Sequence, residues 1–264
     1  MQSSSTFHPD SSVVADVRPS PSCNERKDNV VPDIILLHYT GMPEADVALE
    51  RLCSAQSEVS THYFVYEDGR IVQCVPEALR AWHAGSAAWA GETDINSRSI
   101  GIEVANPGHD HGYPDFARRQ IAAVITLCRG IIARRGIGAD RILAHSDVAP
   151  ARKKDPGEKF PWRLLHESGV GLWVNPVRVS EEGRALRPGQ SGEVVRLLQT
   201  KLADFGYPVP TDGKYDEMTL HVVTAFQRHF RPERIDGLAD DSTRDTLGRL
   251  LAARDEMRRR VGIS

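Results

Sequence analysis

The chain has 264 residues, enough for one sizeable core and a small second domain. Its formal net charge of −3 argues against a nucleic-acid-binding protein, which usually presents a basic face. No run of about 18 apolar residues occurs, so the sequence contains no candidate membrane-spanning helix. The four cysteines are scattered and form no CxxC pair, which excludes zinc-finger and thioredoxin-like motifs.

The first 29 residues are rich in Ser, Pro, Asp and Asn, and this composition predicts a poorly ordered N-terminal arm. The start of the chain has neither the basic region nor the apolar stretch of a secretory signal peptide. We therefore expect a cytoplasmic protein. The alternative is a periplasmic one, if the chain is a mature form or is exported without such a signal.

Short apolar strands and amphipathic helices alternate over the next part of the chain. Strands are predicted at residues 33–38, 61–66, 71–75, 99–104 and 141–144, and helices at 43–52, 116–135 and 161–166. This pattern predicts an α/β fold in which a mixed β-sheet is flanked by helices.

Two of these strands end in histidine. His38 ends the first strand, and His145 follows the last one, at the start of a loop that carries Asp155 ten residues later. Two imidazoles and one carboxylate match a catalytic zinc site, which takes three protein ligands and leaves one position open. Alternatively, each His caps its strand by bonding a backbone carbonyl.

A zinc hydrolase also needs a proton carrier and a group that stabilises an oxyanion. Glu103 lies inside an apolar strand, where a carboxylate is costly unless it is paired or faces a site. We therefore predict Glu103 as the general base and Lys153 as the stabilising cation. The alternatives are a buried salt bridge for Glu103 and a solvated side chain for Lys153.

Five motifs in this order resemble the zinc-dependent N-acetylmuramoyl-L-alanine amidases of the amidase-2 class, which are related to the peptidoglycan recognition proteins and to a phage lysozyme. The motifs lie at residues 35–40, 61–64, 81–85, 100–103 and 145–157. The resemblance implies one zinc ion per chain, with His38, His145 and Asp155 as ligands. It also implies Glu103 as the catalytic carboxylate and Lys153 as its partner.

The resemblance also indicates where the substrate binds. It implies that His62 lies at the cleft, although a buried core histidine is the alternative. Trp82 and His83, on a loop of small residues, are candidates to stack on a sugar and to bond the peptide; simple packing is the alternative. Asn106, beyond the strand of Glu103, and Arg152, beside Lys153, are further candidate substrate contacts.

The composition changes after residue 173. Residues 176–187 are rich in Pro, Glu and Arg and predict a linker. The pattern DGxxDxxT then occurs twice, at residues 212–219 and 236–243, and each copy predicts a tight turn followed by a helix N-cap. With helices expected at 191–202, 219–230 and 243–257, this region predicts a small three-helix domain.

The three-helix region resembles the peptidoglycan-binding domain type 1. The matching positions are Leu198, Gln199, Leu202, Gly206, Tyr207, Asp212, Gly213, Thr219, Phe226 and Gln227. The resemblance covers residues 188–254 and implies binding to peptidoglycan. The alternative is a bundle that only braces the first domain.

We therefore expect an N-terminal arm at 1–29, a zinc amidase domain at 30–175, a linker at 176–187, a peptidoglycan-binding domain at 188–254 and a basic tail at 255–264. The expected reaction is hydrolysis of the amide between N-acetylmuramic acid, or its anhydro form, and the L-alanine of the stem peptide, in cell-wall recycling. The expected partner is peptidoglycan or a muropeptide. The alternatives are a non-catalytic peptidoglycan recognition module and a zinc peptidase of the stem peptide.

Overall fold

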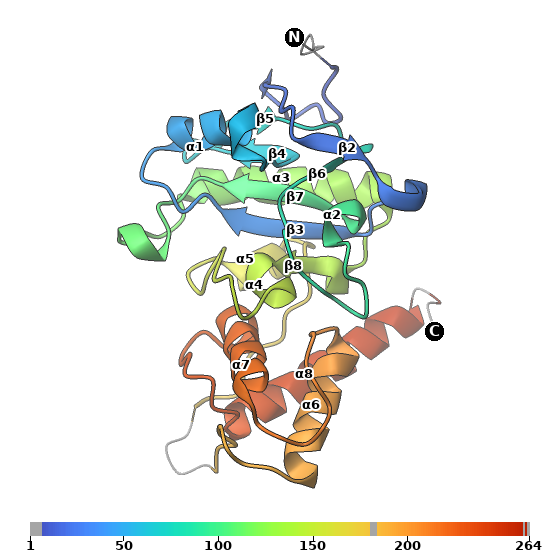
Figure 1. Cartoon of the computed structure of the whole chain (residues 1–264), viewed down its shortest axis with the longest axis vertical. Helices are drawn as coiled ribbons and strands as arrows, with labels where there is room; N and C mark the ends of the chain where they lie inside the picture. The colour runs from blue at the N-terminus through green and yellow to red at the C-terminus, as the bar shows by residue number, and fades with distance from the viewer. Residues whose placement is uncertain (1–6, 180–183, 261, 263–264) are drawn as a thin grey trace.

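The structure is a computed structural model that describes residues 7–179, 184–260 and 262 (Figure 1). Its strands are β1 (Asp16–Val17), β2 (Cys23–Glu25), β3 (Ile34–Tyr39), β4 (Tyr63–Val65), β5 (Ile71–Gln73), β6 (Leu79–Ala81), β7 (Ser99–Val104) and β8 (Ile142–Ala144). Its α-helices are α1 (Ala45–Leu52), α2 (Ile95–Arg98), α3 (Arg118–Arg135), α4 (His145–Val148), α5 (Trp162–Glu167), α6 (Glu193–Phe205), α7 (Glu217–Phe230) and α8 (Asp241–Arg260). None of these helices is long and apolar enough to cross a membrane.

Most of the strands form one mixed sheet in the order β1-β5-β4-β7-β3-β8. The neighbours β4, β7, β3 and β8 run parallel, whereas β5 is antiparallel to β4. The carboxyl ends of parallel strands lie at the same edge of a sheet, so His38 in β3 comes directly opposite Glu103 in β7. The predicted α/β class with a mixed sheet is therefore confirmed.

The two faces of the sheet are covered by different helices (Figure 1). On one face, alternate residues of β3 and β7, such as Ile35 and Ile102, pack against the apolar side of α3. On the other face, α1 packs over Phe64 of β4 and its neighbours in β5. His38 and Glu103 belong to this second face, where the sheet edge is open to a ligand.

The N-terminal residues that the structure describes are part of the fold. Strand β1 pairs with β5, and β2 pairs with β6. The side chain of Arg26 is buried and donates hydrogen bonds to the carbonyls of Ser97 and Ser99. The prediction of a poorly ordered arm is therefore wrong for residues 7–29, because strand pairing and a buried guanidinium offset their polar composition; residues 1–6 lie outside the described part.

Several predicted elements change at their ends. The helix expected at 116–135 begins at Arg118, and the strand expected at 61–66 contains only Tyr63–Val65. A helical turn, α4, begins at His145, where a loop was predicted, because the Asp147 carboxylate accepts the Ala144 N–H at 2.8 Å. Helix α8 continues to Arg260, so most of the expected basic tail is helical.

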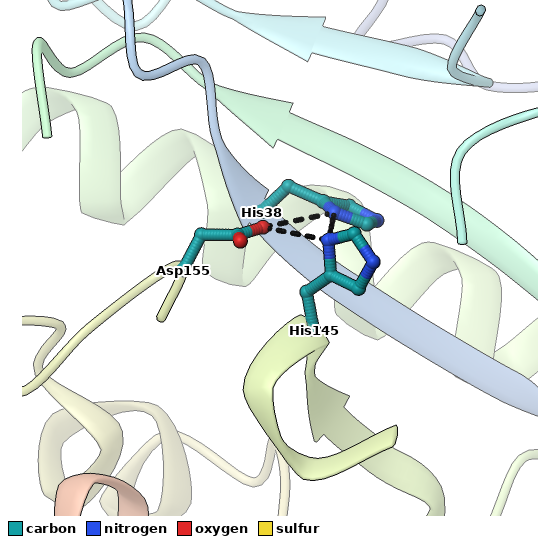
Figure 2. A group of neighbouring side chains, drawn as sticks. All are labelled: His38, His145 and Asp155. Carbon is teal, nitrogen blue, oxygen red and sulfur yellow. Dashed lines mark hydrogen bonds and ion pairs between the residues drawn. The ribbon is translucent and has the colours of Figure 1, made fainter. Parts of the chain in front are cut away.

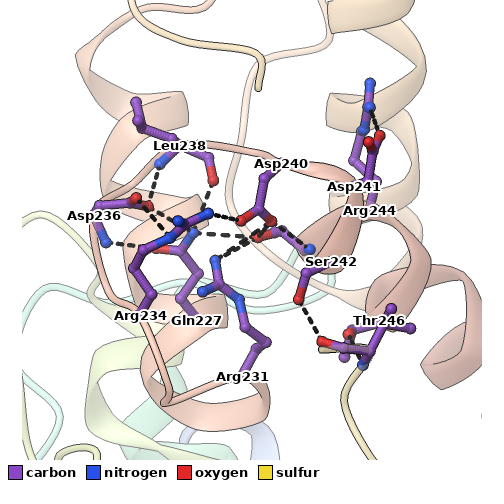
Figure 3. A network of polar contacts seen from close by, with 12 residues as sticks. Gln227, Arg231, Arg234, Asp236, Leu238, Asp240, Asp241, Ser242, Arg244 and Thr246 are labelled. Carbon is purple, nitrogen blue, oxygen red and sulfur yellow. Dashed lines mark hydrogen bonds and ion pairs between the residues drawn. The ribbon is translucent and has the colours of Figure 1, made fainter. Parts of the chain in front are cut away.

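The C-terminal repeat is explained by two buried glutamines. Gln227 of α7 accepts the backbone N–H groups of Asp236 and Gly237 and donates to the Leu238 carbonyl, which fixes the second Asp-Gly turn (Figure 3). Gln199 of α6 accepts the N–H of Gly213 in the same way. Each turn is thus held by the helix before it, which confirms the predicted three-helix arrangement.

A buried charge cluster holds α3 to the strands. The Glu77 carboxylate is fully buried and accepts hydrogen bonds from Tyr63 Oη at 2.7 Å, Arg134 at 2.6 Å and Arg135 at 2.8 Å. Burial alone would raise the pKa of Glu77, but the Arg134, Tyr63 and Arg135 hydrogen bonds hold it below its ordinary value of 4.5.

We predict that Glu77→Gln lowers the free energy of unfolding by about 2 kcal/mol at neutral pH, because charge-assisted hydrogen bonds are lost. The folded-state pKa of Glu77 is lowered, so its contribution is present above pH 4.5 and fades as the pH falls through the folded value. Urea denaturation of both proteins at several pH values should therefore give curves that converge in acid. The control is Glu50→Gln, at an exposed ion pair; a loss at Glu77 that persists unchanged in acid would contradict the prediction.

Candidate metal centre

Three ligand-type side chains converge where β3 ends and α4 begins (Figure 2). The Nδ1 atoms of His38 and His145 are 2.9 Å apart, and Asp155 Oδ2 lies 3.1 Å from the first and 2.9 Å from the second. The side chains come together because β3 and β8 are parallel neighbours and because Ser146 N–H donates to the Asp155 carbonyl, which closes the loop. All three residues are buried.

The Nε2 atom of each histidine, on the side of the ring away from the other ligand-type atoms, has a hydrogen-bond partner in the protein. These partners determine which tautomer each ring adopts. Nε2 of His145 lies 3.0 Å from the Ala84 carbonyl, which can only accept, so in the neutral imidazole Nε2 carries the hydrogen and Nδ1 carries a lone pair. His145 therefore presents a bare nitrogen to the other two side chains.

His38 reaches the same state through a longer chain of hydrogen bonds. The Ser99 hydroxyl donates to the Ile95 carbonyl at 2.6 Å, so its oxygen accepts from His83 Nε2 at 3.2 Å. His83 Nδ1 is then an acceptor and takes the hydrogen of His38 Nε2 at 3.0 Å. Nδ1 of His38 is consequently a bare nitrogen as well.

The centre thus brings three acceptor atoms together with no proton between them. Burial lowers the pKa of His38 to about 4, so its ring is neutral at pH 7. Ligands of a tetrahedral zinc ion at ~2.0–2.1 Å lie about 3.3 Å from one another, close to the spacing seen here. The residues present therefore fit a metal ion.

Glu103 lies beside this centre, one strand away from His38. Its Oε2 atom is buried and has no hydrogen-bond partner within the described chain. Burial and the charge of Asp155 raise the pKa of Glu103 well above its ordinary value, while Lys153 opposes that shift. The arrangement gives no support to a buried salt bridge at Glu103 and leaves one carboxylate oxygen free for a ligand.

A cleft of about 470 Å³ opens over these side chains. Its lining includes His38, Tyr39, Trp82, His83, Glu103, His109, Asp110, His145, Arg152, Lys153, Lys154 and Asp155. The cleft thus combines the three acceptor atoms, a free carboxylate oxygen and several cations, which suits hydrolysis of a polar substrate.

Comparison with protein families agrees with this chemistry. The family model described as N-acetylmuramoyl-L-alanine amidase matches residues 27–158, and the model described as a putative peptidoglycan binding domain matches residues 191–247. The chain belongs to the N-acetylmuramoyl-L-alanine amidase family. The predicted metal ligands and Glu103 all fall within the part matched by the amidase model.

Individual relatives of this amidase extend over most of its length. It is 39% identical over 230 residues to the N-acetylmuramoyl-L-alanine amidase AmiD of Escherichia coli, which covers 83% of this chain and 82% of that protein. The structure of that AmiD in complex with anhydro-N-acetylmuramic acid-L-Ala-D-gamma-Glu-L-Lys matches with a TM-score of 0.71 at 34% identity, covering 87% of this chain and 92% of that one. The crystal structure of AMPDH3 from Pseudomonas aeruginosa matches with a TM-score of 0.67 at 29% identity, covering 87% of this chain and 94% of that one.

Three of the predicted substrate contacts of the amidase line the cleft, namely Trp82, His83 and Arg152. His83 lies behind His38 and orients it. The Nη2 group of Arg152 donates to the carbonyls of Ala84 and Ser86, both at 2.7 Å, and these two bonds hold the guanidinium at the cleft wall. Direct contact between these residues and a substrate stays a prediction.

The other two predicted contacts of the amidase lie elsewhere. His62 is fully buried, with Nδ1 accepting the Gly101 N–H at 2.9 Å and Nε2 at 3.1 Å from the Leu79 carbonyl. Asn106 is also buried; it donates to the Pro114 carbonyl and accepts the Gly108 N–H, each at 2.9 Å. Neither residue lines the cleft, because these polar groups bond the backbone within the protein. Contact between these two residues and a substrate stays a prediction.

Sequence analysis missed several residues of the cleft wall, among them a hydrogen-bonded pair. Tyr39 Oη lies 2.9 Å from His109 Nδ1, and both side chains line the cleft. Tyr39 directly follows the candidate ligand His38, and that adjacency was the available signal. His109 lies in a polar loop with two glycines, Gly108 and Gly112, and nothing in the local pattern sets it apart.

We predict that Asp155→Asn abolishes tight metal binding by the amidase, because the amide lacks the charge that balances the cation. Metal content of the purified full-length protein, measured by atomic emission, would fall from about one ion per chain to near zero. Asp110→Asn, on the wall of the same cleft, is the control and should keep the metal. Full occupancy in the Asp155 variant would refute its role as a ligand.

Proposed function

We propose that the chain is a zinc-dependent N-acetylmuramoyl-L-alanine amidase that cleaves the amide between N-acetylmuramic acid, or its anhydro form, and the L-alanine of the stem peptide. One observation carries the proposal: three proton-free ligand atoms, 2.9–3.1 Å apart, meet beside an unpartnered carboxylate oxygen in an open cleft. Membership of the amidase family indicates which type of bond is cleaved, namely an amide.

The ligand set supports zinc as the metal. Two imidazole nitrogens and one carboxylate oxygen are a common catalytic zinc set, whereas magnesium and calcium prefer oxygen ligands alone. When bound, zinc supplies a Lewis acid that polarises a carbonyl and activates water. His83 and the Ala84 carbonyl hold the outer nitrogens of the two histidines, and such support keeps the rings oriented.

Glu103 and Lys153 are proposed to share the remaining chemistry. With a raised pKa and a free Oε2, Glu103 can take a proton from the attacking water and deliver it to the departing amine of L-alanine. Lys153 lines the same cleft and places a positive charge near the carbonyl oxygen, where negative charge develops in the transition state.

The substrate is proposed to be a muropeptide with an acidic stem. Arg51, Arg152, Lys153 and Lys154 line the cleft, and their charges complement the carboxylates of such a peptide. The relative AmiD was crystallised with an anhydro-muropeptide, and AmpD of Escherichia coli, 34% identical over 162 residues, is named a 1,6-anhydro-N-acetylmuramyl-L-alanine amidase. We propose that residues 30–175 perform catalysis and residues 188–254 bind peptidoglycan, in cell-wall recycling; a cytoplasmic location stays a prediction.

The direct test is product analysis. The full-length protein with one equivalent of zinc is incubated with a soluble anhydro-muropeptide and, separately, with purified sacculi, and the products are identified by mass spectrometry. We expect free anhydro-sugar and a peptide that begins with L-alanine from the muropeptide, and peptides that begin with L-alanine from the sacculi, with no release in the presence of a chelator. Cleavage within the stem peptide would indicate a zinc peptidase, and binding without cleavage would indicate a recognition module; either result would overturn the proposal.

We predict that Glu103→Gln keeps the metal but lowers kcat by about 10²–10⁴-fold, the usual contribution of a general base. The amide keeps the size of the side chain but cannot accept a proton, so zinc content and melting temperature should stay near wild type. Glu67→Gln, in the exposed turn before β5, is the control. Turnover near the wild-type rate in the Glu103 variant would show that another group acts as the base.

A further inference from the structure

Helix α7 lies next to α4 of the amidase domain (Figure 1). Helices α6–α8 share one buried apolar core with that domain. Trp89 is almost fully buried and packs edge-on against Phe205 and Tyr207, with ring centroids 5.8 Å and 5.0 Å away. A Cβ atom at Gly206 would come within 2.5 Å of the Trp89 ring, so the chain approaches as closely as glycine permits. The helices are therefore held against the amidase domain over a packed, apolar surface.

The first polar link across this surface is made at Asp147, two residues after the ligand His145. The Asp147 carboxylate is fully buried, and its Oδ1 accepts from Tyr207 Oη at 2.7 Å. Its Oδ2 accepts from His229 Nδ1 at 2.7 Å and from the Ala144 N–H at 2.8 Å. Two of the three donors that satisfy this carboxylate thus come from the C-terminal helices, and the third fixes the turn that carries His145.

The second link is made at Glu158, three residues after the ligand Asp155. Arg228, next to His229 on α7, forms an ion pair with Glu158 Oε2 at 3.5 Å. The same oxygen accepts from His109 Nε2 at 3.1 Å, and His109 bonds Tyr39 on the cleft wall. One end of α7 therefore contacts both ends of the segment 145–158.

The orientation of His229 is fixed by stacking. Its ring lies between Trp162 and Phe230, with centroids 3.8 Å from each. This placement leaves Nδ1 aimed at Asp147 and limits the movement of the link. A histidine used only to fill space would not need a buried carboxylate partner.

We propose that Tyr207, Arg228 and His229 are positioning residues that hold the two ends of segment 145–158 and so keep His145 and Asp155 at the spacing the metal requires. The proposal rests on the metal site of the proposed function. The C-terminal helices would then contribute to metal affinity, in addition to any contact with the cell wall.

The test compares two buried tyrosine hydroxyls in the full-length protein. Tyr207→Phe removes the bond to Asp147, whereas Tyr215→Phe removes a bond to the Gly237 carbonyl, at 2.6 Å, that lies wholly within the C-terminal domain. Both variants should lower the melting temperature of the metal-free protein to a similar extent. Zinc affinity, measured by competition with a chromophoric chelator, should fall about 10-fold in Tyr207→Phe and stay unchanged in Tyr215→Phe, as expected for loss of support to a metal ligand.

A second pair of variants at His229 keeps the test decisive if Tyr207→Phe folds poorly. His229→Asn keeps a donor near the position of Nδ1 and should retain most of the zinc affinity, whereas His229→Leu should lose it. Equal zinc affinity in Tyr207→Phe and Tyr215→Phe, or in both His229 variants, would overturn the positioning role. A wild-type protein that takes up no zinc would instead refute the metal site itself, so the two failures are distinguishable.

Discussion

The catalytic arrangement depends on three acceptor atoms that face one another without a proton. These atoms are His38 Nδ1, His145 Nδ1 and Asp155 Oδ2. The Nε2 hydrogens of the two imidazoles are donated to His83 and to the Ala84 carbonyl, so the Nδ1 atoms carry lone pairs. Three lone pairs at this spacing repel one another, and burial removes the water that would relieve them. A bound cation would remove this repulsion, so metal binding and the stability of the folded site are coupled.

Two parts of the fold position the residues of this site: the rigid β-sheet and the less regular segment 145–158. His38 and Glu103 lie on neighbouring strands in the middle of the sheet, where the backbone ladder fixes their separation. His145 and Asp155 lie on a segment of turns, which has no ladder of its own. Its geometry depends on the Ser146 hydrogen bond to Asp155 and on the contacts that Asp147 and Glu158 make with α7. The C-terminal helices thus complete the side of the site that the sheet cannot hold.

Sequence patterns identified the parts of the site that follow from strand ends. His38 and His145 end apolar runs, and parallel strands bring such ends together, so their convergence with Asp155 was predictable. The burial of His62 and Asn106 could not be predicted, because a pattern does not show that backbone groups bond their side chains. Sequence patterns also could not predict the strands within residues 16–25 or the contacts of Tyr207 and His229 with Asp147. They are long-range pairings, which composition and local periodicity do not encode.

The most direct test of the central claim is anomalous diffraction at the zinc edge from crystals of the zinc-loaded, full-length protein. The account predicts one strong peak within bonding distance of His38 Nδ1, His145 Nδ1 and a carboxylate oxygen of Asp155, with His83 still bonded to His38 Nε2. A peak bound through the Nε2 atoms, or zinc located away from these three side chains, would contradict it.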